Sequence, residues 1–346
     1  MKLRDSFGRN IDYLRVSVTD RCNLRCLYCM PDGVKLKKRP EILSLEELVH
    51  ICRAAVSCGV KKIKVSGGEP LLRRGLCAFI AALKNEAGAD EVTLTTNGVL
   101  LEEHLPSLAK AGLNAVNVSL DALNPQIFIK TTGLGAAAGS AGFNNETLNR
   151  VVSAIFRAAG MGLNVKINCV PIEGLNESEI IPLSLLAEKT AVAVRFIELM
   201  PLGRASFYRG IPAKKVLQII NEACGPLTAF TGKLGNGPAS YYSAPFWKGV
   251  IGVIPAMSRG FCETCNRLRL SADGVLSSCL SSGENVSLRE ELRKKPEGFG
   301  PEKEAAVKKI IQDVIYNKKA FNDFSPVYNG EKAENRKDKL MWKIGG

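Results

Sequence analysis

The chain has 346 residues, of which 46% are hydrophobic and 23% are charged, proportions typical of a globular protein. Its net charge of +13 favours an anionic partner such as a nucleotide, a polyphosphate or a nucleic acid, although a generally basic surface would give the same value. No apolar run reaches the roughly 18 residues of a membrane span, and the N-terminus forms neither a signal peptide nor a transit peptide. We therefore expect a soluble cytoplasmic protein with no membrane partner, or one of an organelle matrix if a targeting segment is absent from this chain.

Strand-like and helix-like stretches alternate over the first part of the chain. Strands are expected at 13–19, 62–66, 91–96, 114–120, 164–170 and 192–199, and helices at 44–59, 73–87, 102–112, 146–160 and 177–189. The first helix has Ser44 at its N-cap and Glu47 three residues later, the pattern of a capping box. Six strands that alternate with helices predict an α/β fold with a parallel sheet. Because a closed barrel needs eight such units, we expect a partial (β/α)6 TIM-like barrel.

Polar motifs follow five of these expected strands. The motif "TDRCNLRC" follows the first strand, "SGGEP" the second, "TTNG" the third, "SLDAL" the fourth and "ELMPLGR" the sixth. Ligands of parallel α/β sheets bind at the carboxyl ends of the strands. The five loops are therefore expected to meet at one site.

The composition changes from about residue 205 onward. Gly, Pro and Tyr become frequent, and short strands are expected in place of helices until two helices near 287–295 and 301–317. We therefore divide the chain into a barrel at 1–204 and a C-terminal α+β extension at 205–346.

Six of the eleven cysteines fall into two groups of three. The first group, Cys22, Cys26 and Cys29, has the spacing C-x3-C-x2-C. Three thiolates of this kind can hold three irons of a [4Fe–4S] cluster and leave the fourth iron open to a small molecule. Zinc is the alternative, but structural zinc takes four protein ligands, and the chain has only two histidines. The scarcity of histidine also argues against a Ser–His nucleophile.

The second group consists of Cys262, Cys265 and Cys279, again without a convincing fourth ligand. Arg267 and Arg269 alternate on an expected strand, so they would point the same way beside this group. Because guanidinium groups match phosphate oxygens, the pattern favours a second cluster next to an anionic substrate. A zinc ribbon with a distant fourth ligand is the alternative.

The first cysteine group and the "SGGEP" loop resemble those of radical S-adenosylmethionine (SAM) enzymes. Together with "TTNG", "NVSLDAL", "VRFIELMPLG", "CETCNRLRLSADG" and the terminal "IGG", they make the whole chain resemble the GTP 3′,8-cyclase family of these enzymes. The resemblance implies a lyase of molybdenum-cofactor biosynthesis with two [4Fe–4S] clusters, one on each cysteine group. SAM would yield a 5′-deoxyadenosyl radical that takes hydrogen from C3′ of GTP. The C3′ radical would then bond to C8, and an electron and a proton would complete (8S)-3′,8-cyclo-7,8-dihydroguanosine 5′-triphosphate.

The resemblance also implies roles for individual residues, none of them a catalytic side chain. It implies contacts to SAM from Tyr28, Gly68, Ser119 and Met200. It implies contacts to GTP from Arg15, Lys64, Thr95, Lys166, Arg195, Arg267, Leu268 and Arg269, with Lys62 a weaker candidate. The terminal Gly345 and Gly346 would reach into the active-site cavity. Burying a cation in an apolar strand costs free energy unless an anion pairs with it. A bound triphosphate would pair with the basic residues of the strands, which are Arg15, Lys62, Lys64, Lys166 and Arg195. For each of them, a salt bridge within the protein is the alternative.

Further partners implied are a second copy in a homodimer, a reducing electron donor, and cyclic pyranopterin monophosphate synthase, to which the product passes. No nucleic-acid partner is expected. Two features depart from the family pattern: Lys64 stands where arginine is more frequent, and the Gly/Ala-rich stretch 131–145 is longer. One alternative is another radical SAM enzyme with an auxiliary cluster. Another is a zinc-dependent RNA-binding protein, although the chain lacks the aromatic residues expected to stack on bases.

Overall fold

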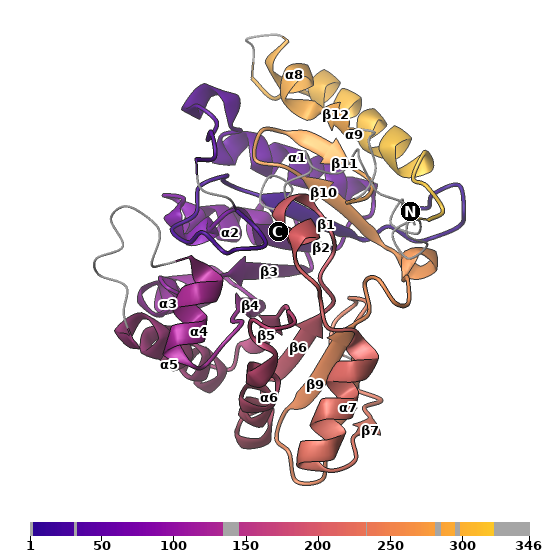
Figure 1. The fold of residues 1–346 in the computed structure, drawn as a ribbon. Helices are drawn as coiled ribbons and strands as arrows, with labels where there is room; N and C mark the ends of the chain where they lie inside the picture. Colours follow the sequence, from indigo (N-terminus) through magenta and orange to yellow (C-terminus); the bar gives the residue numbers. More distant parts are fainter. Residues whose placement is uncertain are drawn as a thin grey trace.

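The computed structural model describes residues 3–30, 33–133, 145–232, 234–280, 285–294 and 298–321. Its main element is a twelve-stranded sheet with the order β12-β11-β10-β1-β2-β3-β4-β5-β6-β9-β8-β7, which runs from top to bottom in Figure 1. The six expected strands form its centre and pair in parallel, in chain order. They are β1 (Tyr13–Ser17), β2 (Lys62–Ser66), β3 (Glu91–Thr96), β4 (Ala115–Ser119), β5 (Asn164–Cys169) and β6 (Ala193–Ile197).

The C-terminal region extends this sheet on both sides. Strand β9 (Val250–Ile254) pairs in parallel with β6, and β10 (Arg267–Leu270) pairs in parallel with β1. Antiparallel strands complete the two edges: β7 (Thr228–Ala229) and β8 (Ser240–Ser243) at one, β11 (Val275–Ser277) and β12 (Asn285–Ser287) at the other. The pairing of β10 with β1 places the second cysteine group next to the first strand of the barrel.

Helices connect the parallel strands as expected. They are α1 (Leu45–Cys58), α2 (Leu76–Asn85), α3 (Leu101–Lys110), α5 (Asn145–Gly160) and α6 (Ile180–Lys189), with α8 (Leu288–Arg293) and α9 (Pro301–Tyr316) near the chain's end. Helix α1 begins with the predicted capping box, because Ser44 Oγ accepts from Glu47 N (3.1 Å) and Glu47 Oε2 accepts from Ser44 N (2.7 Å). Within the described ranges, no helix is long and apolar enough to cross a bilayer.

Two helices were not predicted. Helix α4 (Pro125–Thr132) is capped by Asn124, whose side chain accepts from Gln126 N, and it leads into the Gly/Ala-rich stretch. Helix α7 (Ala213–Cys224) lies where short strands were expected, so that expectation was wrong there. Its buried Ala213, Val216 and Ile220 recur at helical spacing, a signal that the surrounding Gly-rich and Tyr-rich sequence obscured. Most of the stretch 131–145 lies outside the described residues.

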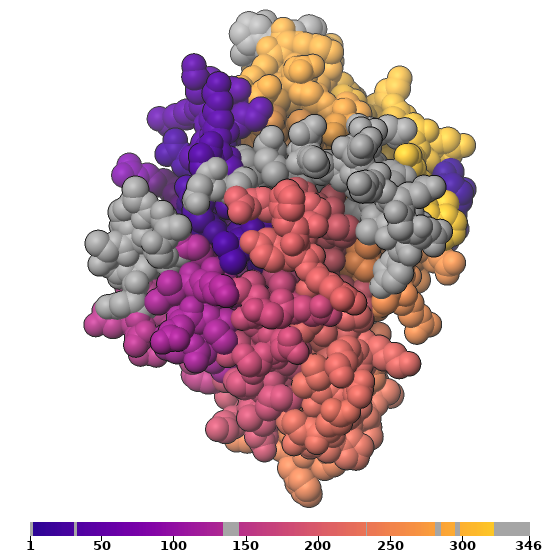
Figure 2. Space-filling model, in the orientation of Figure 1, coloured from indigo at the N-terminus to yellow at the C-terminus, as the bar shows by residue number. Residues whose placement is uncertain are grey.

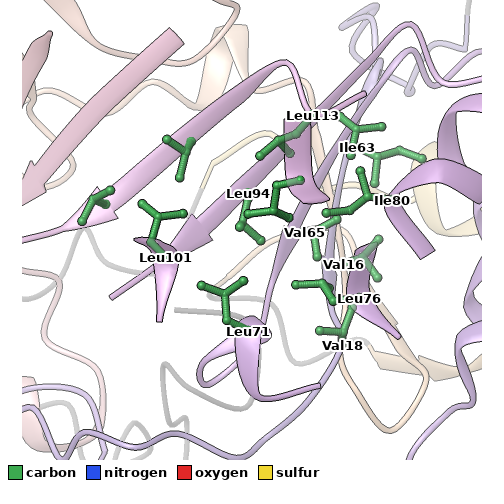
Figure 3. Packing of buried hydrophobic residues seen from close by; sticks show 14 of the residues in the cluster. Val16, Val18, Ile63, Val65, Leu71, Leu76, Ile80, Leu94, Leu101 and Leu113 are labelled. Atoms are coloured by element: carbon green, nitrogen blue, oxygen red, sulfur yellow. The ribbon is translucent and has the colours of Figure 1, made fainter. Parts of the chain in front are cut away.

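The central strands are buried on the side that faces the helices. Figure 3 shows Val16, Ile63 and Val65 of the strands packed with Leu76 and Ile80 of α2, all fully or almost fully buried. Because successive side chains of a strand point to opposite faces, Tyr13 and Arg15 of β1 point to the other, inner face. The apolar outer face therefore stabilises the sheet and leaves the inner face for polar chemistry.

Arg9 ties the N-terminal segment to two distant parts of the chain. Its Nε donates to Asp5 Oδ2 (2.5 Å), and both side chains are almost fully buried. Its Nη atoms donate to the carbonyl oxygens of Cys262 (2.8 Å), Lys319 (2.6 Å) and Ala320 (3.0 Å). Arg9 therefore fixes the start of the second cysteine group against the segment that follows α9.

Replacing Arg9 with Met should lower the midpoint of thermal unfolding by several degrees. The substitution removes a donor from the buried Asp5 carboxylate and from four carbonyl groups, those of Cys262, Lys318, Lys319 and Ala320. Loss of one partner of a buried ion pair costs about 3–5 kcal/mol. Arg4→Met is the matched control, because Arg4 is exposed and its loss should cost less than about 0.5 kcal/mol. Equal midpoints for the two variants, measured anaerobically by circular dichroism, would contradict this role.

Candidate active site

A cavity of about 330 Å³ lies at the carboxyl ends of the parallel strands. Its walls come from inner-face residues of β1 to β6, from the loops after β1, β2, β3, β5 and β6, from the end of β9, and from β10 and the residues after β11. All five polar motifs predicted to meet contribute to it. In the space-filling view, the indigo N-terminal residues and the salmon residues that follow β6 lie side by side on one face (Figure 2).

The first triad (Cys22, Cys26 and Cys29) lines this cavity as three free thiols. A tight turn, in which Cys29 N donates to Cys26 O (2.9 Å), brings the thiols together. Burial raises the pKa of Cys22 to about 11 and that of Cys29 to about 12. Burial, then the charges of Cys29 and Cys22, raise the pKa of Cys26. Three such thiols can all be held as thiolates only by a strongly positive centre, which a metal cluster supplies.

The second triad (Cys262, Cys265 and Cys279) lines the same cavity. Burial of Cys265 acts to raise its pKa, but the cations Lys318 and Arg267 outweigh burial and the pKa is lowered. This triad therefore lies in a positive environment that favours thiolate.

Lys318 ties the parts of the second triad together, and sequence analysis did not find it. Its side chain is 2% exposed, and its Nζ donates to the carbonyl oxygens of Arg267 (3.2 Å) and Ser278. It thereby joins β10 to the residue before Cys279. The sequence carried no signal for this role beyond a lysine just after an amphipathic helix.

The donor set of both triads fits iron–sulfur clusters. Each triad presents three free thiols to a common cavity, and thiolates are the usual ligands of such clusters. Across the described ranges, no three His, Cys, Asp or Glu side chains converge tightly enough to hold a single metal ion.

Five cations line the cavity: Arg15, Lys64, Arg195, Arg267 and Arg269, named here the cavity cations. Three of them form a row, because Arg269 of β10 is in register with Arg15 of β1, and Arg15 with Lys64 of β2. In the part of the chain that the structure describes, none of the five forms an ion pair with a carboxylate.

Burial and mutual repulsion lower the pKa values of several cavity cations. Burial, followed by the charge of Arg269, lowers the pKa of Arg15 to about 9. Burial and then Arg267 lower that of Arg269 to about 10, and burial with four neighbouring cations lowers that of Lys64. The guanidinium of Arg267 lies over the ring of Phe261 (4.7 Å), and its buried Nε has no hydrogen-bond partner among the described residues. An anion in the cavity would reduce the repulsion among the cations and could accept a hydrogen bond from Arg267 Nε.

Four other residues expected to contact ligands also line the cavity. They are Tyr28, Gly68, Ser119 and Met200, joined by Thr95. Gly68 permits the close approach of the loop after β1, because a Cβ there would lie 2.3 Å from the carbonyl oxygen of Arg21. Arg195 is held by Asn117 and Asn168, neither of which was predicted.

Some predicted substrate residues do not line the cavity. Lys62 Nζ pairs with Glu91 Oε2 (2.6 Å), and Lys166 Nζ donates to the carbonyl oxygen of Leu234 (2.7 Å). The side chain of Leu268 is buried in the hydrophobic core, on the face of β10 opposite to the two arginines. Gly345 and Gly346 lie outside the described residues.

Two buried carboxylates organise the cavity wall and were not predicted as site residues. Asp121 accepts from the Tyr28 hydroxyl (2.7 Å) and from Val170 N (2.8 Å), so it fixes the Tyr28 ring. Glu198, at the end of β6, accepts from the backbone N–H groups of Ala213 (2.8 Å), Met257 (2.8 Å) and Ser258 (2.7 Å). Asp121 follows the strand predicted at 114–120, and Glu198 lies near the end of the strand predicted at 192–199; these positions were the available signal.

Comparison with known proteins identifies two family regions. Residues 16–187 match the model of the radical SAM superfamily, and residues 192–324 match that of molybdenum cofactor synthesis C. A GTP 3′,8-cyclase of Pelotomaculum thermopropionicum is 43% identical over 310 residues, which cover 88% of this chain and 91% of that protein. A GTP 3′,8-cyclase of Desulforamulus reducens is 40% identical over 347 residues, 99% of each chain.

A solved structure agrees at the level of the fold. SuiB of Streptococcus suis bound to S-adenosylmethionine superposes with a TM-score of 0.59 and 15% identity, over 96% of this chain and 72% of that one. The expected partial α/β barrel with a C-terminal extension is thus confirmed. The family implies [4Fe–4S] clusters and SAM as cofactors, in agreement with the two cysteine triads. The chain belongs to the GTP 3′,8-cyclase family of radical SAM enzymes.

Proposed function

We propose that this protein converts GTP to 3′,8-cyclo-7,8-dihydro-GTP, the first step of molybdenum-cofactor biosynthesis. The observation that carries the proposal is the set of five cavity cations without a carboxylate partner among the described residues, next to two cysteine triads. A triphosphate supplies about four negative charges and several acceptor oxygens, which match guanidinium forks. The GTP 3′,8-cyclase relatives, up to 43% identical in sequence, support the same substrate.

The two triads would have different tasks. The first triad would hold the cluster that binds SAM, with Tyr28, Gly68, Ser119 and Met200 placing SAM in the cavity. The second triad would hold the cluster that faces the purine of GTP. When bound, SAM and the first cluster supply the radical that removes hydrogen from C3′. The protein itself would supply position, since the strands fix the reacting atoms and the cavity walls limit access of water.

The cavity cations would hold the triphosphate, with Thr95 at the same wall. Lys166 would join them if it exchanged the carbonyl of Leu234 for a phosphate oxygen. Its Nζ lies close to Gly235, and the following Asn236 and Gly237 line the cavity. Lys62 remains the weaker candidate because Glu91 already neutralises it. Leu268 could reach the substrate only through its backbone, since its side chain is in the core.

Residues 1–204 would form the SAM-cleaving barrel, and 205–346 would carry the second cluster and a diglycine tail, Gly345 and Gly346, that enters the cavity. The protein would act as a cytoplasmic or organelle-matrix homodimer. It would take electrons from a reducing donor and pass its product to cyclic pyranopterin monophosphate synthase.

Deuterium at C3′ of GTP should appear in 5′-deoxyadenosine when the reconstituted protein turns over anaerobically with SAM and a reductant. The transfer follows from hydrogen removal at C3′, and mass spectrometry of 5′-deoxyadenosine measures it. GTP deuterated at C2′ is the control and should transfer none. Formation of 5′-deoxyadenosine that neither requires GTP nor acquires deuterium from C3′ would refute the proposed function.

Removing either triad should halve the iron content of the protein, from about eight to about four irons per chain. Replacing the first triad with Ala should abolish SAM cleavage, whereas replacing the second should spare some cleavage without GTP. Iron analysis and 5′-deoxyadenosine assays measure the two effects. Cys224→Ala is the matched control, because Cys224 is isolated and does not line the cavity. Stoichiometric zinc in the anaerobically purified parent would contradict the assignment of the clusters.

A further inference from the structure

Two neutral amide groups hold the buried guanidinium of Arg195. Asn168 Oδ1 accepts from both Nε (2.9 Å) and Nη2 (2.6 Å) of Arg195, and Asn117 Oδ1 accepts from Nη2 (2.8 Å). Asn117 lies on β4, Asn168 on β5 and Arg195 on β6, and Asn168 is in register with Arg195. Arg195 is 8% exposed and Asn117 2%, so the arrangement is part of the sheet's inner face.

The choice of acceptor has an electrostatic consequence. A buried guanidinium ordinarily pairs with a carboxylate, which satisfies its donors and also cancels its charge. An amide oxygen satisfies the donors but carries no net charge, so Arg195 is fixed in place with its full charge retained. Its Nη1 has no hydrogen-bond partner among the described residues, which leaves two N–H donors for a ligand of the cavity.

Lys62 provides the contrast within the same sheet. Lys62 is also a cation on a central strand, but it does not line the cavity, and Glu91 of the neighbouring strand neutralises it (2.6 Å). Lys62, outside the cavity, is thus held by a carboxylate, whereas Arg195, which lines the cavity, is held by two amides.

We propose that Asn117 and Asn168 are positioning residues that set the affinity for the substrate triphosphate by holding Arg195 without neutralising it. The inference rests on the proposed function, because it takes the triphosphate of GTP as the anion. It adds two residues to the substrate site that need not touch the substrate themselves.

Substituting Asn168 separates an electrostatic role from a purely structural one. Asn168→Asp keeps the size of the side chain but places a carboxylate on Arg195, whereas Asn168→Ala removes the acceptor and leaves the charge of Arg195 uncancelled. If charge matters most, the Asp variant should bind GTP more weakly than the Ala variant and at least about ten-fold more weakly than the parent. If Asn168 serves only packing, the isosteric Asp variant should be the better binder, and that order would overturn the proposal.

The measurement is the dissociation constant of GTP for the anaerobically reconstituted holoprotein, with guanosine as the uncharged comparison. Guanosine affinity should change less than about two-fold in the Asp variant, because its ribose and base carry no charge for Arg195. Asn117→Asp should also weaken GTP binding, because it places a carboxylate on Nη2 of Arg195. It serves as the second variant if Asn168→Asp does not fold. Equal losses for GTP and guanosine would overturn the proposal.

The controls keep this inference distinct from the proposed function. Asn149→Asp adds the same charge on the exposed side of α5 and should leave GTP affinity unchanged. Iron content should match the parent in every variant, and Asn149→Asp should also cleave SAM without GTP at the parental rate. A parent that binds no GTP would overturn both the function and the inference, whereas a parent that binds GTP with an unaffected Asn168→Asp variant would overturn the inference alone.

Discussion

Parallel pairing of β10 with β1 is the constraint on which the site depends. It joins two segments more than two hundred residues apart and places Arg269 in register with Arg15, which is itself in register with Lys64. The same pairing brings the second triad to the cavity that the first triad lines. Without it, neither the row of cations nor the common wall of six thiols would exist, although every local motif would remain in the sequence.

A site of this composition is costly for the protein in the absence of its ligands. Burial and nearby like charges disfavour the charged forms of the cavity cations and of the cysteine thiols. The lowered pKa of Arg15 and the raised pKa of Cys29 indicate this. The apolar outer face of the sheet, the Arg9 hydrogen bonds and the buried Lys318 offset this cost. Local conflict of this kind is expected at functional sites, where binding of an anion and of metal clusters resolves it.

The sequence predicted what depends on local pattern and missed what depends on long-range pairing. The six central strands, the capping box of α1, the polar loops after the strands and both cysteine groups followed from periodicity and spacing. Helix α7 and the addition of β9 and β10 to the sheet did not, because nothing local specifies which strand a C-terminal segment joins. Nor could spacing alone show that Lys62 pairs with Glu91, or that Asn117 and Asn168 hold Arg195, since these contacts depend on interstrand register.

Binding of the triphosphate by the unneutralised cavity cations is tested most directly by the affinity of the anaerobic holoprotein for GTP, GDP, GMP and guanosine, compared between the parent and Arg269→Ala. Each phosphate removed should weaken binding, by at least about 100-fold in total, and Arg269→Ala should reduce this difference. Guanosine that binds the parent as tightly as GTP, or an unchanged difference in Arg269→Ala, would contradict this role of the cavity cations.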